Sequence, residues 1–438
     1  MILCEDVSED AVGRTPGHFV LECPVCGFAS EDDGLRLNCD RSHGPALLVS
    51  KYGADVFCPA FGEDGLYRYR QWLPIRRTLK GSGRTVTYQS ESLSKQTGLA
   101  NLWFAFNGYW PEKGACLPTG TFKDLEAYSV LGRMPLDSGR VLVVASAGNT
   151  AAAFARACSL NRVPCLILMP EAGLAQMRFD VPIDSCVKVV SLTGSSDYTD
   201  AIRAADRIAQ LPGFMLEGGA RNIARRDGLG TVLLNAYETI GRLPEFYFQA
   251  IGSGTGAIAA HEAARRITAG RGPYPHLRLS QNAPFVPIRD VWRSRSPEWL
   301  SLNEKRARRE IDQIESKVLC NRCPPYAIRG GLYDALVESE GDVAAVTNEQ
   351  AALAAELFET SEGIDIEPAA AVAFASVLEA AAGGSIPADA TVVVNITGGG
   401  KRKLASDTVL IPKLPDVSID VADAEDGERV FEVLRLFR

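Results

Sequence analysis

Short apolar runs alternate with amphipathic stretches along most of the chain, from about Gly83 onward. This alternation is typical of βαβ units that build a parallel sheet. The clearest strand candidates are residues 141–146, 164–169, 187–192, 246–251 and 391–398, and the helix candidates between them include 150–160 and 196–211. Because connected parallel strands need crossover segments, the pattern predicts an α/β protein with doubly wound parallel sheets.

Three of these predicted strands run directly into turns of small residues. In open α/β sheets, ligands bind beyond the carboxyl ends of the strands, where such turns lead into helices. The first turn, "SAGNTAAAF", begins at Ser146, and its backbone N–H groups could receive a carboxylate. Asn149 and Thr150 could equally serve only to cap the helix that follows.

The second turn, "GSGTG", contains Gly252, Ser253, Gly254, Thr255 and Gly256. Its backbone N–H groups can form a cup for a phosphate at a helix N-terminus. The spacing is GxGxG, and the acidic residue that a dinucleotide site needs about twenty positions later is missing, so NAD is disfavoured. The sequence also contains no GxxxxGK[ST] motif, which removes the usual P-loop.

The third turn, "NITGGGKRK", places Thr397 and the cations Lys401 to Lys403 after a late strand. A glycine turn with a solvated basic cluster would explain it as well as a binding role does. A fourth stretch, "CLPTGTFKDLEA", sets Lys123 inside a Thr/Gly/Phe turn at the predicted start of a helix. Most lysines are solvated charges, yet this setting also suits an amine that forms a Schiff base.

The N-terminal region differs from the rest of the chain. It contains "CPVCG" followed by two further metal-binding residue types, with little helical periodicity between them. The candidate zinc ligands are Cys23, Cys26, Cys39 and His43, and nitrogen and sulfur ligands suit tetrahedral zinc. The second half reads CxxxH rather than CxxC, so a metal-free ribbon remains equally open.

The length and charge of the chain narrow the class of protein. A chain of 438 residues exceeds the size at which one core stops growing, which favours two domains. The net charge of -8 argues against a nucleic-acid or membrane binder and favours small-molecule partners. No apolar run approaches the ~20 residues that span a bilayer, and the first residues are acidic, so we expect a cytoplasmic protein.

The four stretches, in their order along the chain and with the Lys123 stretch first, resemble the β-family of pyridoxal-phosphate (PLP) enzymes, which has the fold type of threonine synthase and tryptophan synthase β. The resemblance implies that Lys123 holds the cofactor as an aldimine and that Asn149 bonds the ring hydroxyl. It implies that Thr397 faces the pyridine nitrogen and that the GSGTG turn cups the cofactor phosphate. The residues implied to receive the substrate carboxylate are Ser146, Ala147, Gly148 and Thr150, with Asn149 among them.

Longer segments narrow the resemblance. The chain is similar to the cysteate synthases of methanogens, a branch of the threonine synthase family. The segments that carry this likeness are residues 83–115, the "CPVCG" motif and "NRCPPYAIRGGLYDAL". The likeness covers about residues 20–405. It implies a β-replacement that converts O-phospho-L-serine and sulfite to L-cysteate and phosphate, toward coenzyme M, through an aminoacrylate. Relatives of this fold type usually self-associate, so the resemblance also implies a homo-oligomer.

Two local departures bear on this resemblance. Threonine synthases usually continue the lysine motif as FKDRG, whereas this chain has "FKDLE", which weakens a threonine synthase acting on O-phosphohomoserine. "RNIARRDGLGT" parallels their Asn-Pro-x-Arg stretch without its proline, and it places Asn222 and Arg225 where a substrate phosphate would be held. A non-catalytic nucleotide-binding regulator is the alternative from another class.

The expected organisation has four parts, one of which is built from two segments of the chain. They are a zinc-ribbon-like segment (1–65), a large PLP-binding domain (66–130 and 235–412), a small mobile domain (131–234) and a C-terminal tail (413–438) to which the sequence assigns no role.

Overall fold

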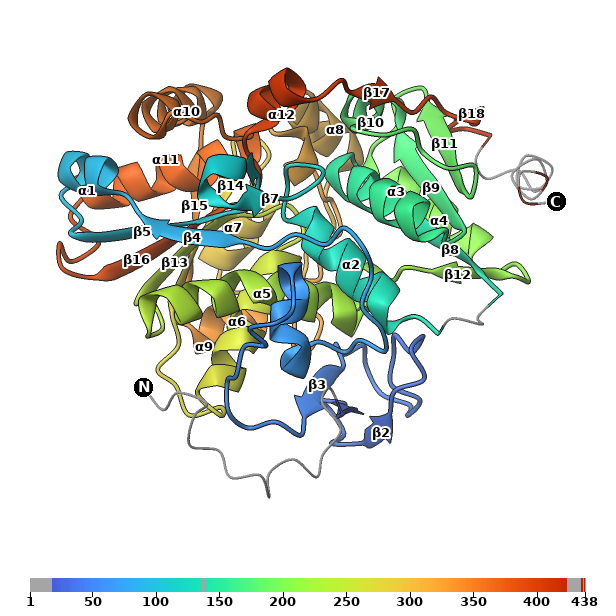
Figure 1. The fold of residues 1–438 in the computed structure, drawn as a ribbon, viewed down its shortest axis with the longest axis horizontal. Helices are drawn as coiled ribbons and strands as arrows, with labels where there is room; N and C mark the ends of the chain where they lie inside the picture. Colours follow the sequence, from blue (N-terminus) through green and yellow to red (C-terminus); the bar gives the residue numbers. More distant parts are fainter. Residues whose placement is uncertain (1–17, 136–138, 424–434, 436, 438) are drawn as a thin grey trace.

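The computed structural model describes residues 18–135 and 139–423, together with residues 435 and 437. Two sheets of mostly parallel strands, each covered by helices on both faces, lie side by side, and a small β-ribbon packs beneath them (Figure 1). This confirms the predicted α/β class. None of the helices in the described part of the chain combines the length and apolar character of a membrane-spanning segment.

The larger sheet has six strands in the order β15-β14-β13-β16-β5-β4. All its neighbours are parallel except β4 and β5. Its strands are β4 (Val86–Gln89), β5 (Asn101–Phe106), β13 (Phe246–Ala250), β14 (His276–Asn282), β15 (Asp342–Val346) and β16 (Thr391–Ile396). The two central strands β13 and β16 are buried along their whole length, as the continuous apolar runs in their sequences require.

Helices cover both faces of this sheet. On one face, α11 packs against β13, β14, β15 and β16, with α10 and α1 beside it. On the other lie α5 and α6, with α9 against α6. Their bounds are α1 (Glu91–Thr97), α5 (Ile223–Ile240), α6 (Thr255–Ile267), α7 (Pro287–Arg293), α8 (Glu304–Gln313), α9 (Leu332–Glu338), α10 (Asn348–Glu362), α11 (Pro368–Ala382) and α12 (Lys401–Asp407).

The smaller sheet is parallel throughout, in the order β12-β8-β9-β11-β18. Helix α4 packs against β8, β9 and β12, while α3 packs against β8, β9 and β11 and also against α2. The elements are α2 (Lys123–Arg133), β8 (Val141–Ala145), α3 (Asn149–Asn161), β9 (Cys165–Pro170), β11 (Val187–Thr193), α4 (Tyr198–Ile208), β12 (Phe214–Leu216) and β18 (Val417–Asp420).

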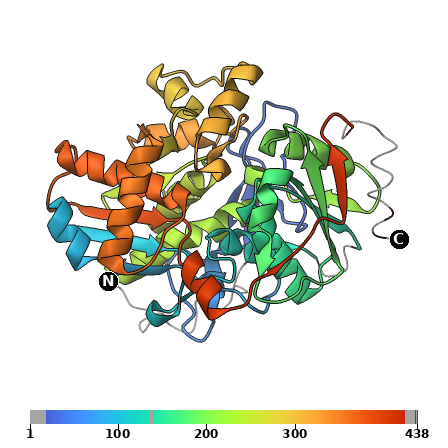
Figure 2. The same ribbon diagram turned by 90° about the horizontal axis from the view of Figure 1, so that it is seen from above.

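The C-terminal segment has a place in the fold that the sequence did not predict. After α12 the chain crosses from the larger to the smaller half, and its last described strand, β18, pairs with β11 (Figure 2). On the way, β17 (Ile411–Pro412) pairs with β10 (Arg178–Phe179). Helix α5 is continuous through residue 234, where we expected the small domain to end, and it packs against α2 and α6.

The N-terminal ribbon has three antiparallel strands: β1 (Phe19–Glu22), β2 (Ala29–Glu31) and β3 (Val49–Tyr52). Buried polar contacts tie it to the helices above. Arg133 of α2 binds Asp32 at 2.6 Å, and the Tyr52 hydroxyl donates to Asp227 of α5 at 2.7 Å. A hairpin of β6 (Tyr109–Trp110) and β7 (Ala115–Cys116) precedes the turn that carries Lys123.

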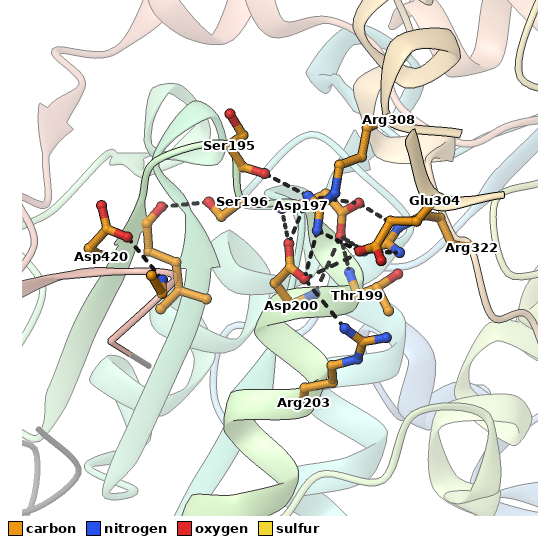
Figure 3. A network of polar contacts seen from close by, with 12 residues as sticks. Ser195, Ser196, Asp197, Thr199, Asp200, Arg203, Glu304, Arg308, Arg322 and Asp420 are labelled. Atoms are coloured by element: carbon orange, nitrogen blue, oxygen red, sulfur yellow. Dashed lines mark hydrogen bonds and ion pairs between the residues drawn. The ribbon is translucent and has the colours of Figure 1, made fainter. Parts of the chain in front are cut away.

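An ion-pair cluster joins the smaller sheet's α4 to the segment between α7 and α9 (Figure 3). Asp197 and Asp200 form a capping box at the start of α4. Arg322 donates to both carboxylate oxygens of Asp197, at 2.6 and 2.9 Å, and Arg308 donates to both oxygens of Asp200, at 3.0 and 3.1 Å. Glu304 contacts both arginines. The cluster therefore fixes the first turn of α4 against the other half of the molecule.

Replacing Arg322 by alanine is expected to lower the free energy of unfolding by about 2 kcal/mol, because two charge-assisted hydrogen bonds to a buried carboxylate are lost. Urea denaturation measures this change. Arg306 is the matched control, since its side chain is 70% exposed and pairs with Glu310 on the surface. R306A should cost less than about 1 kcal/mol. Equal effects of the two variants would contradict the stabilising role of the cluster.

Candidate active site

Lys123 lies at the start of α2, in a turn that is paired with the turn after β16. The N–H of Phe122 donates to the carbonyl of Thr397 at 3.0 Å, and the N–H of Gly399 donates to the carbonyl of Gly120 at 3.1 Å. Gly120 has a φ of +68°, a left-handed conformation that favours glycine. These contacts bring Lys123 and Thr397 together, although they are far apart in the sequence.

The turn before Lys123 is also held from within its own segment. Asp124 is buried and accepts hydrogen bonds from the backbone N–H and the hydroxyl of Thr119, each at 2.9 Å. Burial raises the pKa of the Asp124 carboxyl to about 7, even though both hydrogen bonds from Thr119 lower it. Thr119 and Asp124 therefore hold the turn in place, and these contacts do not use the side chain of Lys123.

One cavity collects most of the residues predicted from the sequence. Lys123, Asn149, Thr397 and the whole turn Gly252–Gly256 line it, together with Phe122, Gln249, Ala250, Ile251, Val318, Leu319 and Ala369. We call it the Lys123 cavity. All four sequence stretches therefore contribute lining residues to one cavity.

The GSGTG turn leads from β13 into α6, which begins at Thr255. Gly254 has a φ of +79°, and a Cβ at Gly256 would lie 2.4 Å from the Gln249 amide. Conformation therefore favours glycine at position 254, and space favours it at position 256. The N–H of Thr255 donates to the Ser253 hydroxyl at 3.3 Å and that of Ala257 to the Gly254 carbonyl at 3.0 Å. The donors that this end of the Lys123 cavity can offer an anion are therefore those of Gly256 and of the turn before it.

The turn after β8 behaves partly as a cap and partly as a cavity wall. The Ser146 hydroxyl accepts hydrogen bonds from the N–H groups of Gly148 and Ala151, at 3.0 and 2.9 Å, so it holds the first turn of α3. Asn149 donates to Glu367 at 2.7 Å. The buried carbonyl oxygen of Asn149 has no hydrogen-bond partner among the described residues, and it belongs to a residue that lines the Lys123 cavity. Such an oxygen is available to a bound molecule.

The amine of Lys123 lies in a buried cluster of charges. It donates to Glu126 at 3.1 Å, and Glu126 also contacts Arg225 at 3.1 Å. Arg225 in turn donates to Glu217 at 2.8 Å. Burial lowers the pKa of Lys123, and the ion pair with Glu126 opposes this by raising it. The net shift is downward, which favours the unprotonated amine that a nucleophile or base requires.

The substrate-phosphate assignment of Asn222 and Arg225 is a prediction that these contacts do not test. Asn222 caps α5: its side-chain oxygen accepts from the N–H of Ala224 at 3.0 Å, and its amide donates to the Glu217 carbonyl at 2.7 Å. Arg225 lines a neighbouring cavity together with Glu217, Ser253 and Thr255, and it is already paired with two carboxylates.

Sequence reasoning assigned no role to Glu126, Glu217, Gln176 or Glu367, which contact the predicted site residues in the structure. For Glu126 a signal was present, because it is the last residue of the "FKDLE" departure. The others come from distant segments and carry no local motif.

The four predicted metal ligands also meet in space. One ligand atom from each of Cys23, Cys26, Cys39 and His43 lies within 4.8 Å of the others. The Cys23 sulfur is 3.3 Å from the Nε2 of His43, and the Cys26 and Cys39 sulfurs are 3.7 Å apart. The arrangement has the composition of a zinc site.

Comparison with known proteins agrees with this geometry. The family model described as "Pyridoxal-phosphate dependent enzyme" matches residues 79–398. Among solved structures, maize serine racemase aligns with a TM-score of 0.53 and 17% identity, covering 74% of this chain and 91% of that one. The processed form of threonine deaminase isoform 2 from Solanum lycopersicum aligns with a TM-score of 0.53 and 15% identity, covering 80% and 88%. These two likenesses show the fold alone.

The fold and the match over residues 79–398 define a PLP-dependent enzyme of the α/β type that the sequence predicted. Similar proteins of curated function narrow the family further. The cysteate synthase of Methanosarcina barkeri is 42% identical over 415 residues, covering 92% of this chain and 99% of the relative. That of Methanocorpusculum labreanum is 44% identical over 396 residues, covering 89% and 95%. The chain belongs to the cysteate synthase family, which confirms the narrower resemblance.

Proposed function

We propose that the protein converts O-phospho-L-serine and sulfite to L-cysteate and phosphate, as a step toward coenzyme M. The observation that carries the proposal is the meeting of Lys123, Asn149, Thr397 and the GSGTG turn in one cavity, in a chain with this relatedness to cysteate synthases. In the reaction, the bond between Cβ and the phosphate oxygen breaks and a bond between Cβ and the sulfite sulfur forms.

The residues of the Lys123 cavity fit PLP. The N–H groups at the start of α6 suit its phosphate, and the unpartnered oxygen of Asn149 suits its ring hydroxyl. Lys123 supplies the amine that binds its aldehyde, and Thr397 supplies an uncharged hydroxyl for its ring nitrogen. When bound, PLP withdraws electrons from the substrate Cα.

The remaining roles belong to the chain itself. The Lys123 amine, once released by the substrate, takes the Cα proton and later returns it. The backbone of Ser146–Thr150 receives the substrate carboxylate at the start of α3. Lys401 is our candidate for the incoming sulfite: its amine contacts Glu367 and Gln176, each at 2.7 Å. Glu367 also binds Asn149, and Gln176 packs against Gly148.

The test is a product assay. Purified protein loaded with PLP is incubated with O-phospho-L-serine with and without sulfite, and cysteate and phosphate are measured by mass spectrometry and a colorimetric assay. We expect cysteate only when sulfite is present, in equal amount to phosphate. Threonine from O-phosphohomoserine, without cysteate from phosphoserine, would replace this proposal by the threonine synthase alternative. Membership of a PLP-dependent enzyme family gives no support to a non-catalytic nucleotide-binding regulator.

We also propose that Cys23, Cys26, Cys39 and His43 hold a structural zinc ion, because their ligand atoms lie close together. Elemental analysis should find about one zinc per chain, and C26S/C39S should lose it. The double variant should also unfold at lower denaturant concentration. The cluster belongs to the ribbon and not to the Lys123 cavity, so covalent attachment of PLP should persist. Purified protein free of metal, with unchanged stability in the double variant, would favour the metal-free ribbon.

A further inference from the structure

Glu126 is fully buried beside the proposed cofactor lysine, one helical turn further along α2. Residues three apart on a helix lie on the same face, so the sequence places the two side chains together. One carboxylate oxygen of Glu126 accepts from the Lys123 amine at 3.1 Å. The other accepts from the Thr150 hydroxyl at 2.8 Å and contacts Arg225 at 3.1 Å. Both oxygens are therefore occupied by specific partners.

The charged and titratable groups around Lys123 come from several elements. Besides Glu126, they are Arg225 on α5 and Glu217 after β12, with the buried phenol of Tyr198 on α4 near Arg225. Burial raises the pKa of Tyr198 to about 12, so this phenol stays neutral near pH 7. Of these groups, Glu126 is the carboxylate in direct contact with the amine. Its charge raises the pKa of Lys123, while burial and Arg225 lower it.

We propose that Glu126 is a positioning residue for Lys123, whose carboxylate holds the amine at the cavity and balances its charge whenever it carries a proton. This inference depends on the proposal that Lys123 binds the cofactor. Arg225 contacts Glu126 at 3.1 Å, so the buried carboxylate has a cationic partner besides the amine. When the substrate releases Lys123, the free amine stays beside a fixed acceptor.

The second oxygen of Glu126 extends this role to the substrate. Thr150 stands in the first turn of α3, within the stretch that we propose receives the substrate carboxylate. The carboxylate of Glu126 therefore accepts from the Lys123 amine on α2 and from the Thr150 hydroxyl on α3. The geometry thus fixes the distance between the base and the carboxylate end of the substrate, which sets where the Cα proton lies relative to the amine.

Cofactor attachment to the apoprotein tests this inference without the overall reaction. Apoprotein is mixed with PLP at a series of pH values, and the rate of covalent attachment is followed by borohydride trapping and mass spectrometry. The amine reacts only without its proton, so the rate rises with pH around the pKa of Lys123. E126Q removes the neighbouring negative charge, and we expect the midpoint to move to lower pH by about one unit or more.

E217Q is the matched control, because Glu217 pairs with Arg225 and does not contact the amine. Its midpoint should move by less than half as much. Equal shifts in the two variants, or an unchanged midpoint in folded E126Q, would overturn the inference. Should E126Q fail to fold, E126Q/E217Q/R225Q neutralises the guanidinium together with both of its carboxylate partners. The midpoint of its pH dependence is expected below that of the parent, because the contact with the amine is made by Glu126. A midpoint at or above the parent value would overturn the inference.

The same assay distinguishes a failure of the Glu126 inference from a failure of the proposal that Lys123 binds the cofactor. K123A should show no trapped adduct on α2. Attachment at another lysine would overturn the cofactor assignment of Lys123. A missing cysteate product, with normal attachment at Lys123, would overturn only the proposed reaction.

Discussion

Replacement of Lys123 by alanine is expected to abolish covalent attachment of PLP and to lower the rate of cysteate formation by at least about a thousandfold. The amine has two proposed roles, as the group that binds the cofactor and as the base that moves the Cα proton, and a positioned base alone contributes 10²–10⁴-fold. Mass spectrometry after borohydride reduction measures attachment, and product formation measures activity.

K95A is the control for this change, since Lys95 is an exposed lysine near the end of α1. It should keep both attachment and activity. The loss in K123A is specific if the variant still unfolds cooperatively at a similar denaturant concentration. A K123A protein that forms cysteate at a rate comparable to the parent would show that another amine binds the cofactor.

Replacement of Arg225 by alanine is expected to lower the free energy of unfolding by about 3–5 kcal/mol, because it leaves buried carboxylates without their charge partner. The side chains of Glu126 and Glu217 are 0% and 4% exposed, so water cannot replace the guanidinium without rearrangement. Chemical denaturation of the apoprotein measures the change without any contribution from bound ligands.

R265A is the control for R225A, because it removes an exposed arginine instead of a buried one. Arg265 is 49% exposed and pairs with Glu338, which is itself 40% exposed. Its removal should cost less than about 1 kcal/mol. A small effect of R225A on unfolding, combined with a large rise in the KM for O-phospho-L-serine, would show that the main role of Arg225 is to hold the substrate phosphate.

The sequence predicted the α/β fold and the strands that lead into the site because these features have local signatures. The run at 141–146 is apolar except for its last residue, the run at 391–398 contains three valines in succession, and they form β8 and β16 within two residues of the predicted ends. The GSGTG turn could be found because its glycine spacing directly after an apolar run is a local signature, and the structure requires a glycine conformation at Gly254. The same reasoning does not extend to groups whose importance arises only from contacts between distant segments.

Two features illustrate this limit. Strand β18 is short, contains alternating polar residues and owes its existence to pairing with β11, so its own sequence indicates little. The charge cluster around Lys123 joins α2, α5 and the loop after β12, and the sequence alone does not indicate that Arg225 pairs there with Glu126 and Glu217. Their burial is a property of the assembled fold.

The pairing between the turn that carries Lys123 and the turn after β16 has a consequence for the synthesis of the protein. The hydrogen bonds from Phe122 to Thr397 and from Gly399 to Gly120 require a segment that is translated near the end of the chain. While the ribosome is still adding the preceding residues, the lysine turn lacks its partner and the cavity lacks one wall. The vitamin-derived cofactor can therefore be captured in its final setting only after almost the whole polypeptide has emerged.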